Sequence, residues 1–147
     1  MKRFGALAAT ALALAAATTT AFADSYEVRL YGTVTDAGQV VDRMVIDYGK
    51  GATVSAIDVD TFTVHALAST AAARDGTDVV SYGDYEIDRT IVKVAAKKNL
   101  VTVYFSQAEG ATLAYLSAAR NYPAELTYTI TQNKALTLKK GGKTASD

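Results

Sequence analysis

The sequence contains no cysteine, which excludes disulfide bonds, thiolate zinc sites and a cysteine nucleophile. It also lacks tryptophan, and it holds one proline, Pro123, and one histidine, His65. No G-x-S-x-G nucleophile motif, dinucleotide-binding or phosphate-loop glycine pattern, or internal repeat is present. None of the asparagines begins an N-glycosylation sequon. The common local signatures of hydrolases and nucleotide-binding enzymes are therefore missing from these residues.

An excess of either charge is missing as well. The chain has 15 basic and 15 acidic residues, so its formal net charge is zero. Nucleic-acid binding usually leaves a concentrated basic face, and no such concentration occurs here. We expect no nucleic-acid partner, and no cofactor or metal is indicated by any spacing of ligand residues.

A short apolar segment at the amino terminus has the layout of a secretory signal peptide. Lys2 and Arg3 precede an alanine-rich run, and Ala21-Phe22-Ala23 supplies the small-x-small cleavage pattern. The run is too short for the roughly 20 apolar residues of a membrane span. We therefore predict a signal peptide over residues 1–23 and an exported, extracellular or periplasmic protein of bacterial type that has no membrane attachment after cleavage. Loss of Lys2 and Arg3 takes the basic residues from 15 to 13, so the mature net charge becomes −2.

Alternation of apolar and polar residues dominates the rest of the chain. Such alternation is typical of strands with one buried face. The predicted strands are YEVRLYGTV, VVDRMVIDYG, TFTVHAL, EIDRTIVKVAA, LVTVYFSQ, ELTYTITQ and ALTLK. Six or seven short strands at even spacing predict an all-β protein, an antiparallel β-sandwich over residues 24–138.

Three segments depart from this pattern. Residues 66–76, ALASTAAARDG, favour a surface loop because their apolar side chains are small. Residues 108–121, AEGATLAYLSAARN, leave a helical turn and an irregular strand both open, with Pro123 ending any helix. Residues 139–147, KKGGKTASD, have the composition of a polar linker or tail.

His65 is the first candidate for chemistry. A Ser-His-Asp hydrolase needs a histidine that contacts both the nucleophile and an orienting acid. His65 alternates with Phe62 and Val64, so it is predicted to point away from the core, whereas Phe62 points into it. We interpret His65 as an exposed strand residue and predict no catalytic residue.

The D-x-D pair Asp58 and Asp60 is the second candidate. A calcium loop of the EF-hand kind would continue with a third acid and a glycine, but Thr61 to Val64 follow instead. An aspartate ahead of a strand commonly accepts a hydrogen bond from its own turn, and this interpretation is favoured. The acidic stretches 75–78 and 83–88 are further segments that could supply calcium ligands only if the fold brings them together.

The nine tyrosines are the third candidate. Exposed tyrosines form contact surfaces for carbohydrate or protein at low entropic cost. Tyr82, Tyr85, Tyr115 and Tyr122 are predicted to lie in loops and could form such a surface, although tyrosine is also common in ordinary strands.

Three runs of the chain resemble a known family. They are MVIDYGKGATVSAIDVDTFTVHA, RTIVKVAAKKNLVTVYFS and LTYTITQNKALTL, which together span most of the mature chain. They resemble the immunoglobulin-like amino-terminal domain of secreted bacterial esterases of the esterase-A type, in which a small sandwich precedes an α/β-hydrolase domain. The resemblance implies that DTFTV at 60–64 is framework, and that the catalytic machinery lies in another domain.

From this resemblance we expect a non-catalytic accessory domain of a secreted esterase or related hydrolase. Its partner would be a downstream or separate α/β-hydrolase domain, and assembly into a homo-oligomer is a further option. The alternative is a stand-alone secreted module that binds a polysaccharide or a protein surface.

Overall fold

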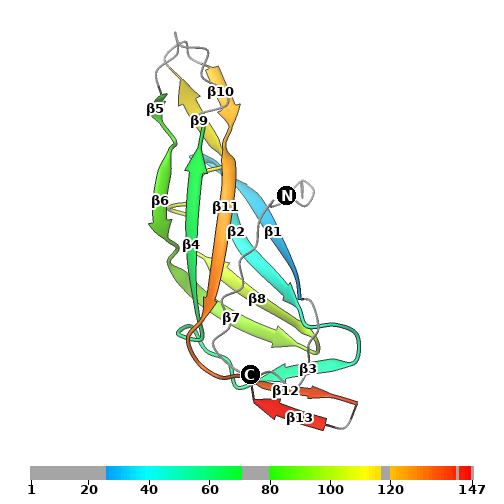
Figure 1. The fold of residues 1–147 in the computed structure, drawn as a ribbon. Coiled ribbons are helices and arrows are strands. Elements are labelled where there is room, and N and C mark those ends of the chain that lie inside the picture. Colours follow the sequence, from blue (N-terminus) through cyan, green and yellow to red (C-terminus); the bar gives the residue numbers. More distant parts are fainter. Residues whose placement is uncertain (1–25, 71–79, 117–119, 142, 147) are drawn as a thin grey trace.

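The computed structural model describes residues 26–70, 80–116, 120–141 and 143–146 (Figure 1). The predicted signal peptide lies outside these residues. The described chain is all-β and antiparallel, as predicted. Its strands are β1 Glu27–Thr35, β2 Gly38–Asp47, β3 Ala52–Ser55, β4 Phe62–Ser69, β5 Val80–Tyr82, β6 Tyr85–Asp88, β7 Ile91–Lys97, β8 Leu100–Phe105, β9 Leu113–Leu116, β10 Arg120–Pro123, β11 Glu125–Gln132, β12 Thr137–Lys140 and β13 Lys143–Ser146.

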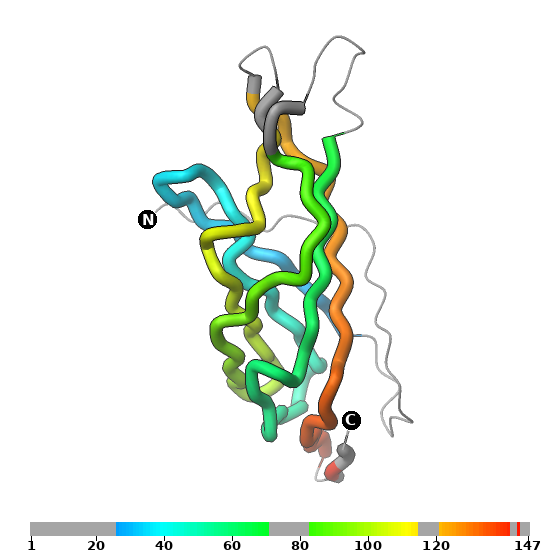
Figure 2. The backbone as a smooth tube through the Cα atoms, turned by 90° about the vertical axis from the view of Figure 1, so that its left-hand side faces the viewer, coloured from blue at the N-terminus to red at the C-terminus, as the bar shows by residue number. Residues whose placement is uncertain are grey.

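Two main sheets pack on one core. One has four strands in the order β1-β2-β8-β7, and the other has three in the order β11-β4-β6. Figure 2 shows β4 and β11 as one layer, with β2 and β8 in the other. Two smaller three-stranded sheets, β10-β9-β5 and β13-β12-β3, lie at opposite ends of the molecule (Figure 1).

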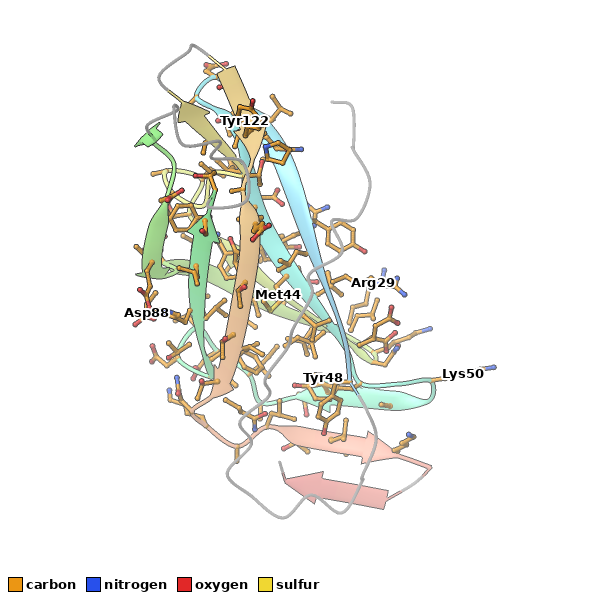
Figure 3. The ribbon with its side chains drawn as sticks, turned by 45° about the horizontal axis from the view of Figure 1, so that its top comes forward. Arg29, Met44, Tyr48, Lys50, Asp88 and Tyr122 are labelled. Atoms are coloured by element: carbon orange, nitrogen blue, oxygen red, sulfur yellow. The ribbon has the colours of Figure 1, made fainter. Side chains whose placement is uncertain are left out.

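The core is made by the inward residues of both main sheets. On β4 the alternation runs without interruption, so Phe62, Val64, Ala66 and Ala68 are buried while Thr63 and Leu67 are exposed. Figure 3 shows Met44 of β2 in the interior and Asp88 at the periphery. The predicted placement of Phe62 inside and His65 outside is confirmed.

The alternation predicted for the first two strands is wrong at one point. Tyr31 pairs with Arg43 and Gly32 pairs with Val41, so Asp42 of β2 is an extra residue without a partner in β1. This β-bulge reverses the alternation of β2, and Val41 is therefore buried in the core together with Met44. Val34 lies in step with Leu30 along the alternation of β1, yet it is 62% exposed whereas Leu30 is buried. The reason is that β8 covers β2 only from Arg43 onward, so this end of the hairpin extends beyond the sheet.

The strand predicted over residues 86–96 is two strands. β6 ends at Asp88 and β7 begins at Ile91, and the two belong to different main sheets. Arg89 and Thr90 form the crossing between them. Local alternation continued through this crossing, which is why the sequence predicted a single strand.

The three segments that departed from the alternation also contain strands in the structure. β4 continues to Ser69, and the residues that it buries at this end, Ala66 and Ala68, have small side chains. Residues 71–79 lie outside the described chain. Of the two interpretations of 108–121, the strand is found, as β9 and β10. Residues 139–146 contain the end of β12 and all of β13, a paired hairpin where composition predicted a linker or tail.

Candidate functional site

His65 lies between two carboxylates on the outer face of the β11-β4-β6 sheet. It is the cross-strand neighbour of Asp88 on β6, and Glu86 shares that face two residues earlier. The ring Nδ1 is 2.8 Å from Asp88 Oδ1, and Nε2 is 3.2 Å from Glu86 Oε1. The three side chains are 43%, 70% and 69% exposed. Both ring nitrogens of His65 are therefore engaged by acids at the surface.

This arrangement favours the charged imidazolium. The hydrogen bond with Asp88, and then the one with Glu86, raises the pKa of His65 above its ordinary value. A raised pKa in the folded state adds stability at acidic pH that is lost as the pH rises through that pKa. Since the three side chains are exposed, solvent screens the interaction. The triplet is an ion-pair cluster between two strands, and its geometry differs from that of a histidine poised to deprotonate a hydroxyl group.

Asp58 and Asp60 form a turn closed by a lysine. Asp58 Oδ1 accepts a hydrogen bond from the Asp60 backbone N–H at 2.9 Å, the local turn interaction that the sequence favoured over calcium. Lys134 Nζ lies 3.2 Å from Asp58 Oδ2 and 3.3 Å from Asp60 Oδ2. This lysine, followed by the turn interaction, lowers the pKa of Asp58. An ammonium group thus already occupies the position between the two carboxylates.

Of the other two acidic stretches, residues 83–88 belong to the described part of the chain. Asp84 Oδ1 accepts hydrogen bonds from the backbone N–H and the hydroxyl of Thr70, and Asp88 bonds His65. Asp75 and Asp78 lie outside the described residues. Among the residues that the structure describes, no group of three or more histidine or acidic side chains could hold a metal ion.

The prediction that four tyrosines lie in loops is wrong. They lie in the short strands β5, β6, β9 and β10, which have only three or four residues each and leave little alternation to recognise. Tyr85 is half-buried, and its hydroxyl donates to the Ala111 carbonyl at 3.0 Å. Burial raises the pKa of Tyr85 far above its ordinary value, so the group stays a hydrogen-bond donor.

Sequence reasoning missed the most constrained polar residue, Arg89. Its side chain is fully buried at the crossing between the two main sheets. One guanidinium nitrogen, Nη1, donates to the hydroxyl of Tyr128. The other, Nη2, donates to three backbone carbonyls, those of Val41 at 3.0 Å, Ser106 at 3.1 Å and Glu109 at 3.2 Å. The guanidinium group of Arg89 therefore links β2, β11 and the loop after β8 through hydrogen bonds.

The rest of the guanidinium contacts aromatic rings and an acid. Its central carbon lies 4.7 Å from the centroid of Phe105 and 5.8 Å from that of Tyr128, both cation–π distances. Nε has no hydrogen-bond partner among the described residues, and Glu109 Oε1 is 3.9 Å from it. Glu109 instead accepts from the Thr90 backbone N–H at 2.6 Å. The charge of Arg89 is thus balanced mainly by carbonyl dipoles and aromatic faces.

A pocket of about 300 Å³ lies next to this loop. Tyr85, Gly110 and Ala111 line one part of it, and Val40 and Ile87 supply apolar surface. Its two carboxylates are Glu109, which is bonded to Thr90, and Asp84, which is bonded to Thr70. The pocket therefore presents carboxylates that already have partners.

The comparisons with known proteins identify no relative. No family model, no curated protein and no solved structure matches the chain. Among the described residues, no helix has the length and apolarity needed to cross a membrane.

Proposed function

We propose that this protein is a non-catalytic β-sandwich module that serves as an accessory domain of a secreted ester hydrolase. The proposal that the module is non-catalytic rests on the hydrogen bonds of His65. Both ring nitrogens are engaged, Nδ1 by Asp88 and Nε2 by Glu86, so neither faces a hydroxyl nucleophile. A hydrolytic base needs one nitrogen toward the nucleophile and the other toward an acid.

The other polar groups support the same proposal. Asp58 and Asp60 are both paired with Lys134, and Arg89 donates its hydrogen bonds to backbone carbonyls and to Tyr128. Side chains that could perform chemistry are thus used to close turns and join strands. The accessory role itself rests on the resemblance to the immunoglobulin-like domain of secreted esterases.

In that role the module packs on, or helps to assemble, an α/β-hydrolase domain carried on the same or a separate chain. The expected result of reading the gene beyond codon 147 is a continuing frame that encodes a hydrolase domain with a G-x-S-x-G motif. Removing the module from that longer protein is expected to lower the melting temperature of the catalytic domain.

A different result would favour the stand-alone binding module. A stop codon after Asp147, together with retention of the purified protein on an insoluble polysaccharide, would contradict the accessory role. An unchanged melting temperature of the catalytic domain without the module would contradict packing between the two.

A further inference from the structure

Two turns that lie far apart in the sequence enclose a pocket at one end of the molecule. The first turn joins β2 to β3, and the second joins β7 to β8. Figure 1 shows both turns and the end of β12 at the same end of the protein. The pocket between the turns has a volume of about 520 Å³, and its side chains are those of Asp47, Lys50, Ala52, Thr53, Lys98 and Asn99. This volume is within the range of roughly 300–1,000 Å³ that ligand sites have.

The lining of the pocket suits a polar ligand. Among the described residues that form it, Ala52 supplies the only apolar side chain, and none is aromatic. Ala52 is itself buried, so the accessible groups are ammonium, hydroxyl, amide and backbone groups. We infer that a ligand of this pocket carries charge and hydroxyl groups.

Hydrogen bonds hold the two turns in one arrangement. Asp47 Oδ1 accepts from the Gly49 N–H at 2.9 Å and from the side-chain amide of Asn99 at 2.6 Å. The Tyr48 N–H donates to the Asn99 carbonyl at 2.9 Å. The Asp47 carboxylate therefore joins the two turns, and the lysines of the pocket extend from a fixed backbone.

Lys50 and Lys98 are the positive charges of the pocket. Both are exposed, and neither forms an ion pair with a described residue. Figure 3 shows Lys50 extending away from the protein. The carboxylate of Asp47 is bonded to two neutral donors, and Glu27, which pairs with Asp47 across the strands, forms an ion pair with Arg29 at 2.7 Å. Two ammonium groups in this setting attract an anion.

Three further lysines surround the pocket. Lys97 is the last residue of β7, next to the second turn. Lys139 and Lys140 of β12 pair with Thr53 and Ala52 of β3, both of which line the pocket. The five lysines come from three segments that are far apart in the sequence. Their concentration at one end of the molecule therefore arises only in the fold.

The backbone at Lys98 has a conformation that glycine usually adopts. Its φ is 56°, and the only other described residue of a type other than glycine with a positive φ is Ala56. Lys98 and Asn99 are the two central residues of a turn closed by the pair Lys97 and Leu100. A positive φ at the first central position of such a turn favours glycine, and a side chain there is strained. A lysine in this strained position indicates that its side chain is used.

We propose that this pocket binds an acidic polysaccharide, with Lys50 and Lys98 as the two contacts to its carboxylate groups. An ammonium group forms strong, charge-assisted hydrogen bonds with a carboxylate. The exposed hydroxyl of Thr53 donates to or accepts from a sugar hydroxyl. The three surrounding lysines contact further acidic sugars, because a polysaccharide repeats its charge along the chain.

Two other classes of polyanion fit the pocket less well. Single-stranded nucleic acid is bound largely by stacking of its bases on aromatic side chains, and no described aromatic side chain lines the pocket. A basic surface that binds an anionic membrane also inserts large apolar side chains. Of the exposed large hydrophobic residues, only Leu100 adjoins one of the two turns in the sequence. An accessory domain and a stand-alone module can both bind polysaccharide, so this proposal does not depend on an esterase partner.

Titration of the isotope-labelled protein with oligogalacturonate, which carries one carboxylate per sugar, tests the proposal by nuclear magnetic resonance. Shift changes are expected at the amides of residues 49–53 and 97–99, and they should weaken as salt is added. A neutral glucose oligosaccharide of the same length is expected to cause none. No change, changes confined to another part of the molecule, or an equal response to the neutral sugar would overturn the proposal.

Charge removal at single positions tests the two contacts. Lys50→Gln and Lys98→Gln are each expected to weaken binding by about tenfold or more, because each removes a charge-assisted hydrogen bond. Lys93→Gln is the matched control, since Lys93 is exposed on β7 outside the pocket and its loss changes the net charge equally. Equal weakening by all three substitutions would reduce the effect to net charge and overturn the proposal.

Lys98→Gly separates binding from folding. Glycine suits the backbone at this position, so the melting temperature is expected to stay the same or rise while binding weakens. Ala56→Gly relaxes the other positive φ without removing a charge, and it should leave binding intact. A fall in the melting temperature of Lys98→Gly would show that the lysine serves the turn, and would contradict its assignment as a contact.

Two further ligands distinguish the class of polyanion. Oligothymidine and vesicles that contain phosphatidylserine are added to the protein at the same salt concentration as oligogalacturonate. Both are expected to bind more weakly than oligogalacturonate. Tighter binding of oligothymidine would make the site a nucleic-acid site, and tighter binding of the vesicles would make it a membrane site. Either result would overturn the assignment to an acidic polysaccharide.

Discussion

Replacing Arg89 with alanine is expected to lower the free energy of unfolding by about 4 kcal/mol or more, because several buried groups lose their partners together. The Val41, Ser106 and Glu109 carbonyls and the Tyr128 hydroxyl all receive its hydrogen bonds. An unsatisfied buried polar group costs about 1–3 kcal/mol. Urea unfolding followed by circular dichroism measures the loss.

Two further variants make this result specific. Arg89→Lys is expected to be nearly as damaging, because a lysine ammonium cannot reproduce the planar fork that reaches several acceptors at once. Arg29→Ala is the matched control, since Arg29 is exposed and forms its ion pair with Glu27 of the same strand. Unfolding of Arg89→Ala at the same urea concentration as Arg29→Ala would show that the crossing does not depend on the guanidinium.

Phe62→Ala is the second large effect. Phe62 is 4% exposed at the start of β4 and belongs to the core shared by the two main sheets. Truncating a buried phenylalanine costs about 3–5 kcal/mol, a large share of the roughly 5–15 kcal/mol that stabilises a domain. Without a cysteine, no disulfide compensates for the loss. Urea unfolding of the variant beside the unmodified protein measures the cost.

His65→Ala is the control for the same strand. Its side chain points to the opposite face and is 43% exposed, with partners that solvent screens. Its effect on the unfolding midpoint is expected to be a small fraction of that of Phe62→Ala. An equal effect of the two substitutions would mean that β4 presents the other face to the core.

The local features of the fold were readable from the sequence, and the long-range ones were not. Alternation predicted β4 correctly because Phe62, Val64 and Ala66 follow one another on one face without a break. It failed at Asp42, where one extra residue reverses the faces, because a bulge depends on the partner strand. Of the short strands at the two ends of the molecule, β12 was predicted and β9 and β10 were left open, whereas β3, β5 and β13 were missed. β3 and β5 pair with strands that lie far away in the sequence.

For the polar sites, too, the sequence predicted the local contacts and missed the long-range ones. The turn at Asp58 was predicted because its hydrogen bond to Asp60 is local. Lys134 lies 76 residues from Asp58, and Asp88 lies 23 residues from His65, so no spacing pointed to these ion pairs. Arg89 was hidden for a further reason, since it lies in a crossing that the alternation pattern had merged into one strand. A charged residue within an alternating pattern is predicted to be exposed, whereas the fold buries Arg89.

We propose that this chain carries no hydrolytic activity of its own. The hydrolysis of short-chain nitrophenyl esters by the purified protein, with His65→Ala measured in parallel, tests this proposal. Both proteins are expected to release nitrophenol at the rate of buffer alone, because Asp88 and Glu86 engage the two ring nitrogens of His65. Turnover above buffer that disappears in His65→Ala would contradict the claim and make His65 a catalytic residue.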